Sequence, residues 1–129
     1  MAAVKFAPVL GSLVLFGVII QIILGFQISA GADELIGTHL LIGVVGLVMV
    51  LALTVVAFRG KSAPSYAKII MIILALVVLA QVGLGFQLLS GADALTISHE
   101  ANAFVILILS LLMGAVTMKA AKKQIHTTT

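Results

Sequence analysis

Two histidines, His39 and His99, occupy matching places in a sequence that repeats itself after 60 residues. The stretch from Gln21 to His39 matches the stretch from Gln81 to His99 at ten of nineteen positions without a gap. Chance matches at Leu or Val are common in a chain that is 63% hydrophobic, but matches at Gln, Gly, Phe, Asp and His in register are not. The sequence therefore predicts a duplicated helical hairpin with one imidazole at the same place in each copy.

The two imidazoles are candidates for the axial ligands of one haem. Each follows an aspartate, Asp33 or Asp93, by six residues, which places it about 9 Å along a helix that rises 1.5 Å per residue. Ionisable side chains at membrane depth are costly and by default indicate a functional site. A porphyrin supplies four ligands to iron, so two histidines complete the set, whereas bare zinc or copper would need further protein ligands. The alternative is a pair of interhelical hydrogen bonders without a cofactor.

Small and polar residues accompany the histidines. Gly43 and Gly46 follow His39 by four and seven residues, so they share its helix face and leave room for a flat ring. Glutamines in the other two spans are candidates to hydrogen-bond between helices, to bond the second nitrogen of a ligating histidine or to contact the edge of a cofactor. The same glycines also suit close helix packing, and the sequence leaves both interpretations open. The full predicted cofactor-binding set is His39, His99, Gly43, Gly46, Ala103, Gln21, Gln81, Gly25 and Gly85.

The elements that position these residues are four long apolar helices. A mean hydropathy of +1.37 and a charged fraction of 9% exclude an ordinary soluble domain, in which about a quarter of residues are charged. Four apolar stretches each reach the ~20 residues that cross a bilayer. The sequence predicts an all-α, integral membrane, up-down four-helix bundle made of two tandem hairpins. Residues 1–129 form one domain, with spans near 7–30, 35–58, 66–89 and 95–118, repeats near 7–58 and 66–118, and a cytoplasmic linker at 59–65.

The two hairpin turns carry matching residues. Gly31 is expected to end the first helix near Ala30 in the left-handed conformation. Asp33 is expected to cap the next helix, its carboxylate accepting free backbone N–H groups. Gly91 and Asp93 repeat this arrangement between the third and fourth spans.

The distribution of charge predicts the orientation. By the positive-inside rule both termini and the linker are cytoplasmic, and the turns and histidines face outward across a prokaryotic-type plasma membrane. The net charge of +3 is thus a signal of topology and predicts no binding of nucleic acid. The absence of cysteine excludes disulfides, iron–sulfur clusters and covalently attached haem. The basic residues are Lys5, Arg59, Lys61, Lys68, Lys119, Lys122 and Lys123, and the acidic residues are Asp33, Glu34, Asp93 and Glu100.

The repeated motif resembles the heme A synthase family of membrane proteins. The resemblance is carried by Gln-x-x-Leu-Gly, a short turn and a histidine early in the next span, over residues 15–50 and 75–110. Members have two four-helix halves with haem-ligating histidines on the second and fourth helices, and this chain resembles one half. The resemblance implies that His39 and His99 ligate one haem. The chain departs from the family at Ile36, where a functional glutamate is typical, and it has no outward Arg or Lys to pair with haem propionates.

Three functions follow from these features. The first is a b-type cytochrome that carries electrons in or beside a respiratory or oxidoreductase complex, because two axial histidines leave no open position on iron. The second is a compact heme A synthase-like enzyme that oxidises a methyl group of a haem, with haem O or haem A bound. The third is a haem-free accessory subunit of a larger membrane complex. The expected partners are the lipid bilayer, other membrane redox subunits or further copies of the chain, and quinone as an additional candidate. Whether the chain is an enzyme stays open.

Overall fold

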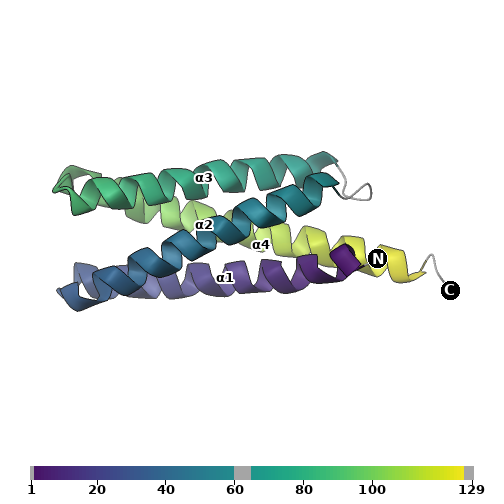
Figure 1. Ribbon diagram of the computed structural model, residues 1–129, viewed down its shortest axis with the longest axis horizontal. Helices are drawn as coiled ribbons and strands as arrows, with labels where there is room; N and C mark the ends of the chain where they lie inside the picture. The colour runs from purple at the N-terminus through teal and green to yellow at the C-terminus, as the bar shows by residue number, and fades with distance from the viewer. Residues whose placement is uncertain (1, 60–64, 127–129) are drawn as a thin grey trace.

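A computed structural model describes the backbone of residues 2–59 and 65–126, and the side chains of residues 9, 11–59, 65–116 and 118 (Figure 1). This part of the chain forms four α-helices and two short 3₁₀ turns, and it contains no strand, which confirms the predicted all-α class. Residues 60–64 of the predicted linker lie outside the described residues. The elements are α1 (Ala2–Ser29), η1 (Asp33–Leu35), α2 (Ile36–Arg59), α3 (Ser65–Leu89), η2 (Asp93–Leu95) and α4 (Thr96–His126).

The helices form a bundle in which consecutive helices run in opposite directions (Figure 1). Helix α1 packs against α2 and α4, and α3 packs against the same two helices. Helices α2 and α4 therefore lie diagonally across the bundle from each other. This is the arrangement that would let a residue on α2 face its counterpart on α4.

All four helices are long and apolar enough to cross a membrane. Within a bilayer every backbone polar group must be satisfied inside its own segment, which an α-helix achieves. Large apolar side chains point outward along the bundle, such as Phe16 and Leu41, at 63% and 64% exposed. A surface of this kind suits contact with lipid. The qualifying segments are Gly11–Ser29, Asp33–Arg59, Ser65–Leu89 and Asp93–Val116.

The tightest packing lies in the half of the bundle away from the turns. Met71 on α3 and Val50 on α2 are the largest fully buried side chains, each 1% exposed. Since lipid is as apolar as a protein interior, such helices associate mainly through close packing of side chains. The buried apolar cluster consists of Val14, Val50, Leu53, Met71, Leu74, Val78 and Ile106.

The two turns end α1 and α3 by the same backbone motif. Gly31 has φ +102° and Gly91 has φ +91°, which confirms the predicted left-handed glycines. In the first turn the Ala32 N–H donates to the Gln27 carbonyl at 3.0 Å, and the Gly31 N–H donates to the Ile28 carbonyl at 2.9 Å. This pair of bonds defines a Schellman motif, which satisfies carbonyls at the helix end.

The interpretation of Asp33 as a side-chain cap is wrong. Each aspartate begins a 3₁₀ turn, and no side-chain capping bond forms at either one. Instead the Leu35 N–H donates to the Ala32 carbonyl at 3.0 Å, and the Leu95 N–H donates to the Ala92 carbonyl at 2.9 Å. A 3₁₀ bond satisfies a helix-terminal N–H without a side chain, so the aspartate carboxylates stay exposed to solvent.

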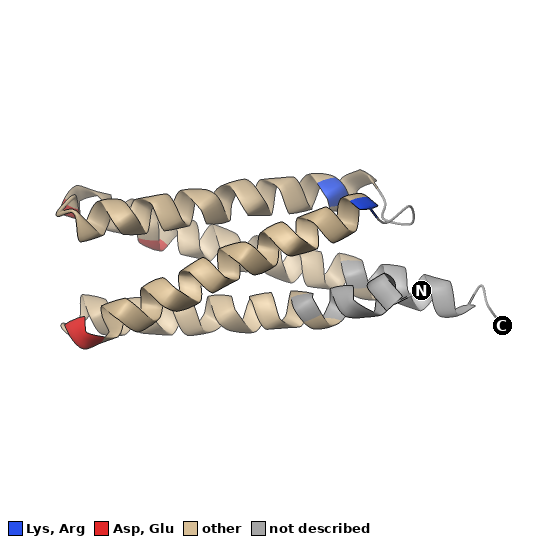
Figure 2. Ribbon diagram, in the orientation of Figure 1, with Lys and Arg blue, Asp and Glu red and all other residues tan. Residues whose placement is uncertain are grey.

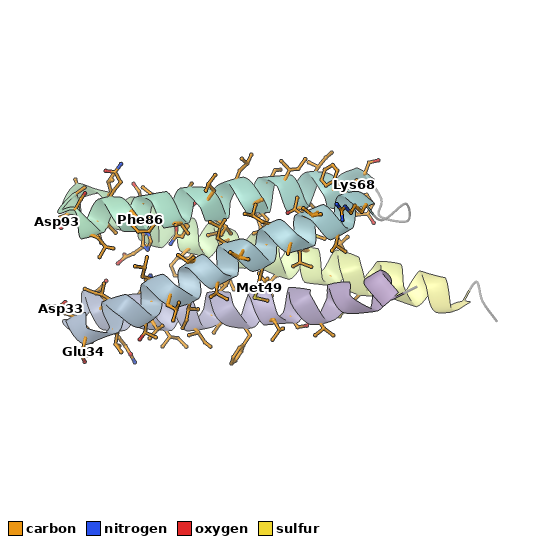
Figure 3. The ribbon with its side chains drawn as sticks, in the orientation of Figure 1. Asp33, Glu34, Met49, Lys68, Phe86 and Asp93 are labelled. Carbon is orange, nitrogen blue, oxygen red and sulfur yellow. The ribbon has the colours of Figure 1, made fainter. Side chains whose placement is uncertain are left out.

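Among the described residues, acidic residues gather toward the end of the bundle that carries the turns and basic residues toward the opposite end (Figure 2). Asp33, Glu34 and Asp93 lie at the end that carries the turns, and Lys68 lies at the opposite end (Figure 3). Arg59 ends α2 at the same end as Lys68 (Figure 2). Lys61 lies outside the described residues, and the side chains of Lys5, Lys119, Lys122, Lys123 and His126 are not among those described.

Candidate cofactor site

The structure brings His39 and His99 together from the diagonal helices α2 and α4. Their ring centroids are 6.0 Å apart, and the ring planes are inclined by 57°. Two imidazoles that share one metal ion have ligating nitrogens about 4 Å apart, twice a metal–imidazole bond, which places their centroids ~6 Å apart. The spacing of the two rings therefore suits a pair of ligands to one metal centre.

A glycine of the same hairpin lies beside each ring. A Cβ atom on Gly25 of α1 would lie 3.7 Å from Cε1 of His39, and one on Gly85 of α3 would lie 3.4 Å from Cε1 of His99. Both glycines belong to the predicted cofactor-binding set, and the structure places them against the histidines. A Cβ atom at either position would make ordinary van der Waals contact with the ring, so the ring lies directly against the glycine.

The Gln21 side chain hydrogen-bonds to the backbone carbonyl of His39 and not to its imidazole ring. Its Nε2 donates to the His39 carbonyl oxygen at 2.6 Å. The amide lies over Gly43, where a Cβ atom would be 3.3 Å from Gln21 Nε2. A glycine at this position is what allows the close approach. Of the roles expected for Gln21, the structure shows the hydrogen bond between helices, here from α1 to α2.

Gln81 occupies the equivalent place on α3 but bonds the ring. Its Nε2 lies 3.2 Å from Nε2 of His99. The position that corresponds to Gly43 is Ala103, and Gln81 and Ala103 line the same cavity between the helices. The structure thus places Gln81, unlike Gln21, in the predicted position beside a histidine nitrogen.

Asn102 is a polar residue of the site that the sequence reasoning missed. Its Nδ2 donates to Gln81 Oε1 at 2.7 Å and to the Val77 carbonyl at 3.0 Å. The first half has Ile42 at this position. The sequence did offer one sign of this role, because the polar amide of Asn102 stands where the first half has an aliphatic side chain.

Both imidazoles have unmet hydrogen-bonding capacity. Nδ1 of His39 and Nδ1 of His99 are buried and lack a hydrogen-bond partner in the described part of the chain. Buried polar atoms normally have a partner, so each exception calls for an explanation. Because the χ2 angle of histidine is broad, a ring with an unpaired nitrogen can turn to present either nitrogen to a ligand.

A cavity of about 160 Å³ opens between the helices next to the site. Met49 of α2 reaches toward it from the middle of the bundle (Figure 3). Neither histidine lines this cavity, and its volume is below the roughly 300 Å³ at which ligand pockets usually begin. A porphyrin would therefore require the surrounding helices to separate. The polar and small residues that line the cavity are Gly17, Gln21, Gly43, Gly46, Gln81 and Ala103.

The donor set suits haem better than a bare metal ion. Among the described residues no three His, Cys, Asp or Glu side chains group closely enough to hold an ion. Two imidazoles suffice only where the cofactor supplies the remaining ligands, as a porphyrin does.

No protein-family model, curated protein or solved structure matches this chain. The resemblance to heme A synthases therefore depends on the repeated motif and on the pair of histidines that it carries.

Proposed function

We propose that this chain is an integral membrane b-type haem protein that transfers electrons in or beside a membrane redox complex. The observation that carries the proposal is the approach of the His39 and His99 rings to a centroid distance of 6.0 Å across diagonal helices. Haem b would supply a one-electron iron couple there. Since both axial positions would be taken by imidazole, electron transfer is favoured over chemistry at an open iron position.

The neighbours of the two histidines have separate parts in this proposal. Gly25 and Gly85 give the rings a flat surface to lie against. Without haem, Gln21 ties α1 to the carbonyl of His39 on α2, and Gln81 ties α3 to the ring of His99 on α4. Gly43, Gly46 and Ala103 keep side-chain bulk away from the adjacent cavity.

The small volume of that cavity favours a second candidate, a haem-free accessory subunit. About 160 Å³ is less than a bound cofactor needs, and small residues along the helices also serve close packing. In that case the paired histidines would hydrogen-bond within the bundle and hold no metal.

An optical spectrum of the purified chain separates these candidates. We expect about one haem per chain and a sharp low-spin spectrum on reduction with dithionite, unchanged by carbon monoxide. Pyridine extraction identifies the haem, and haem O or haem A in the extract would indicate a heme A synthase-like enzyme. Folded protein from haem-replete cells that shows no absorbance would contradict the haem proposal and leave the accessory subunit.

We also propose that the two hairpins arose by tandem duplication. The ten identities between residues 21–39 and 81–99 support this origin. The turns support it too, because each of the five backbone hydrogen bonds of the first turn recurs 60 residues later. For example, the Ala92 N–H donates to the Gln87 carbonyl at 3.1 Å, as the Ala32 N–H does to the Gln27 carbonyl at 3.0 Å.

The proposed orientation places the turns outside a prokaryotic-type plasma membrane and both termini in the cytoplasm. Because the chain has no cysteine, single cysteines report on topology without background. We expect Ala94→Cys, in an exposed turn, to react with a membrane-impermeant maleimide in intact cells. Ser65→Cys, exposed at the start of α3, is the matched control and should react only after the membrane is opened. The reverse pattern of labelling would show an inverted protein.

A further inference from the structure

A hydrogen-bond chain in the second half of the bundle makes the two histidines chemically unequal. It runs from the Val77 carbonyl to Asn102, then to Gln81 and then to the ring of His99, with distances of 3.0, 2.7 and 3.2 Å. The first half has no such chain, since Ile42 replaces the asparagine and Gln21 bonds the His39 carbonyl. Nδ1 of the His39 ring has no hydrogen-bond partner among the described residues, and the Gln21 side chain bonds the His39 carbonyl.

The direction of each bond in this chain follows from its first member. A backbone carbonyl only accepts, so the Asn102 group that faces Val77 must be its NH₂ group. The same NH₂ group donates to Gln81, so the Gln81 atom that faces it must be the amide oxygen. The amide nitrogen of Gln81 then faces His99, and an amide nitrogen only donates. Nε2 of His99 is therefore the acceptor.

We infer that Asn102 is a positioning residue which, through Gln81, holds His99 in the tautomer that carries its proton on Nδ1. In a neutral imidazole one nitrogen is the donor and the other the acceptor. The lone pair on Nε2 of His99 is thus engaged by Gln81, while the equivalent amide of the first half, that of Gln21, bonds the His39 carbonyl. If the proposed haem function holds, on which this consequence rests, His39 is the ready ligand and His99 binds iron only in exchange for the Gln81 bond.

The inference is tested by the nitrogen-15 spectrum of the full-length chain prepared without haem and labelled on histidine. Long-range proton–nitrogen correlations identify which ring nitrogen is protonated, and single substitutions assign the three histidines. We expect His99 in the Nδ1-protonated form. Gln81→Met keeps the side-chain length but removes the hydrogen-bond donor. In this variant we expect His99 to populate both neutral tautomers. Gln21→Met is the matched control from the equivalent position, and it should leave the tautomer of His99 unchanged.

Asn102→Ile introduces the residue that the first half has at position 42, and it tests the hydrogen bond between Asn102 and Gln81. It should also shift the His99 tautomer, so the inference does not depend on the folding of a single variant. His99 protonated on Nε2 in the wild type would overturn the inference, as would unchanged His99 signals in both Gln81→Met and Asn102→Ile. A haem titration forms the second arm, in which relief of one competing hydrogen bond should strengthen binding roughly two- to tenfold in both variants. Failure of the wild type to bind haem would defeat the proposed function and leave the tautomer result standing.

Discussion

Replacing either His39 or His99 by alanine is expected to remove haem from the protein. Loss of a residue that merely supports a metal ligand costs roughly 10–100-fold in metal affinity, so loss of an axial ligand should cost at least as much. The two rings lie 6.0 Å apart, and no third side chain in the described part of the chain is grouped with them to replace either one. The measurement is the ratio of haem to protein after purification, together with the reduced spectrum.

The control for these variants is His126→Ala, at the third histidine of the chain, which follows the last apolar span. We expect it to retain haem at the level of the wild type. Far-ultraviolet circular dichroism should show unchanged helicity in all three variants, because the helices are held by backbone hydrogen bonds that these substitutions do not remove. Full haem content in folded His39→Ala or folded His99→Ala would disprove ligation by the pair.

Met71→Ala is expected to destabilise the bundle by about 2 kcal/mol. Large-to-small substitutions in the cores of soluble proteins cost ~2–5 kcal/mol, part of which is transfer of the removed atoms to water and part the cavity left behind. In a bilayer the unfolded helices stay in an apolar solvent, so the cavity contribution dominates and the cost falls to the low end. Met71 is 1% exposed on α3 and contacts the buried cluster, so little collapse into the space is possible. Unfolding of the purified protein in mixed micelles by a denaturing detergent measures the difference.

Met118→Ala is the matched control, because it makes the same change at a side chain that is 59% exposed. Its effect should stay within about 0.5 kcal/mol, as for surface substitutions that disturb no special feature. Equal destabilisation by the two variants would show that the cluster around Met71 does not hold the helices together.

Several features of the fold were predictable because they depend on local sequence. The four helices follow from the length of the apolar stretches, and no partner segment is needed to satisfy their backbone groups. The turns at Gly31 and Gly91 follow from the freedom of glycine to adopt positive φ. The pairing of His39 with His99 was expected from the repeat, since equivalent positions on helices α2 and α4 can face each other across a common axis.

The arrangement of the polar side chains around the histidines was decided by tertiary contacts. Gln21 and Gln81 are equivalent in the sequence, yet one bonds a carbonyl and the other a ring. Their neighbours on other helices differ, with Gly43 and Ile42 beside Gln21 where the second half has Ala103 and Asn102. Asn102 donates to the amide oxygen of Gln81, and no pattern along one helix reports such a contact with the next.

The sequence by itself thus determined the class of fold, the number of membrane-length helices among the described residues and the pairing of the histidines, because hydropathy, glycine and repetition act locally or by symmetry. Only the tertiary structure decided the 3₁₀ turns that replace aspartate caps, the volume of about 160 Å³ beside the site and the inequality of the two rings. The volume and the inequality of the rings depend on small differences in the distances between helices, which packing sets and sequence periodicity does not encode. The 3₁₀ turns are set by the backbone of each hairpin turn, in which the N–H groups of Leu35 and Leu95 find backbone acceptors.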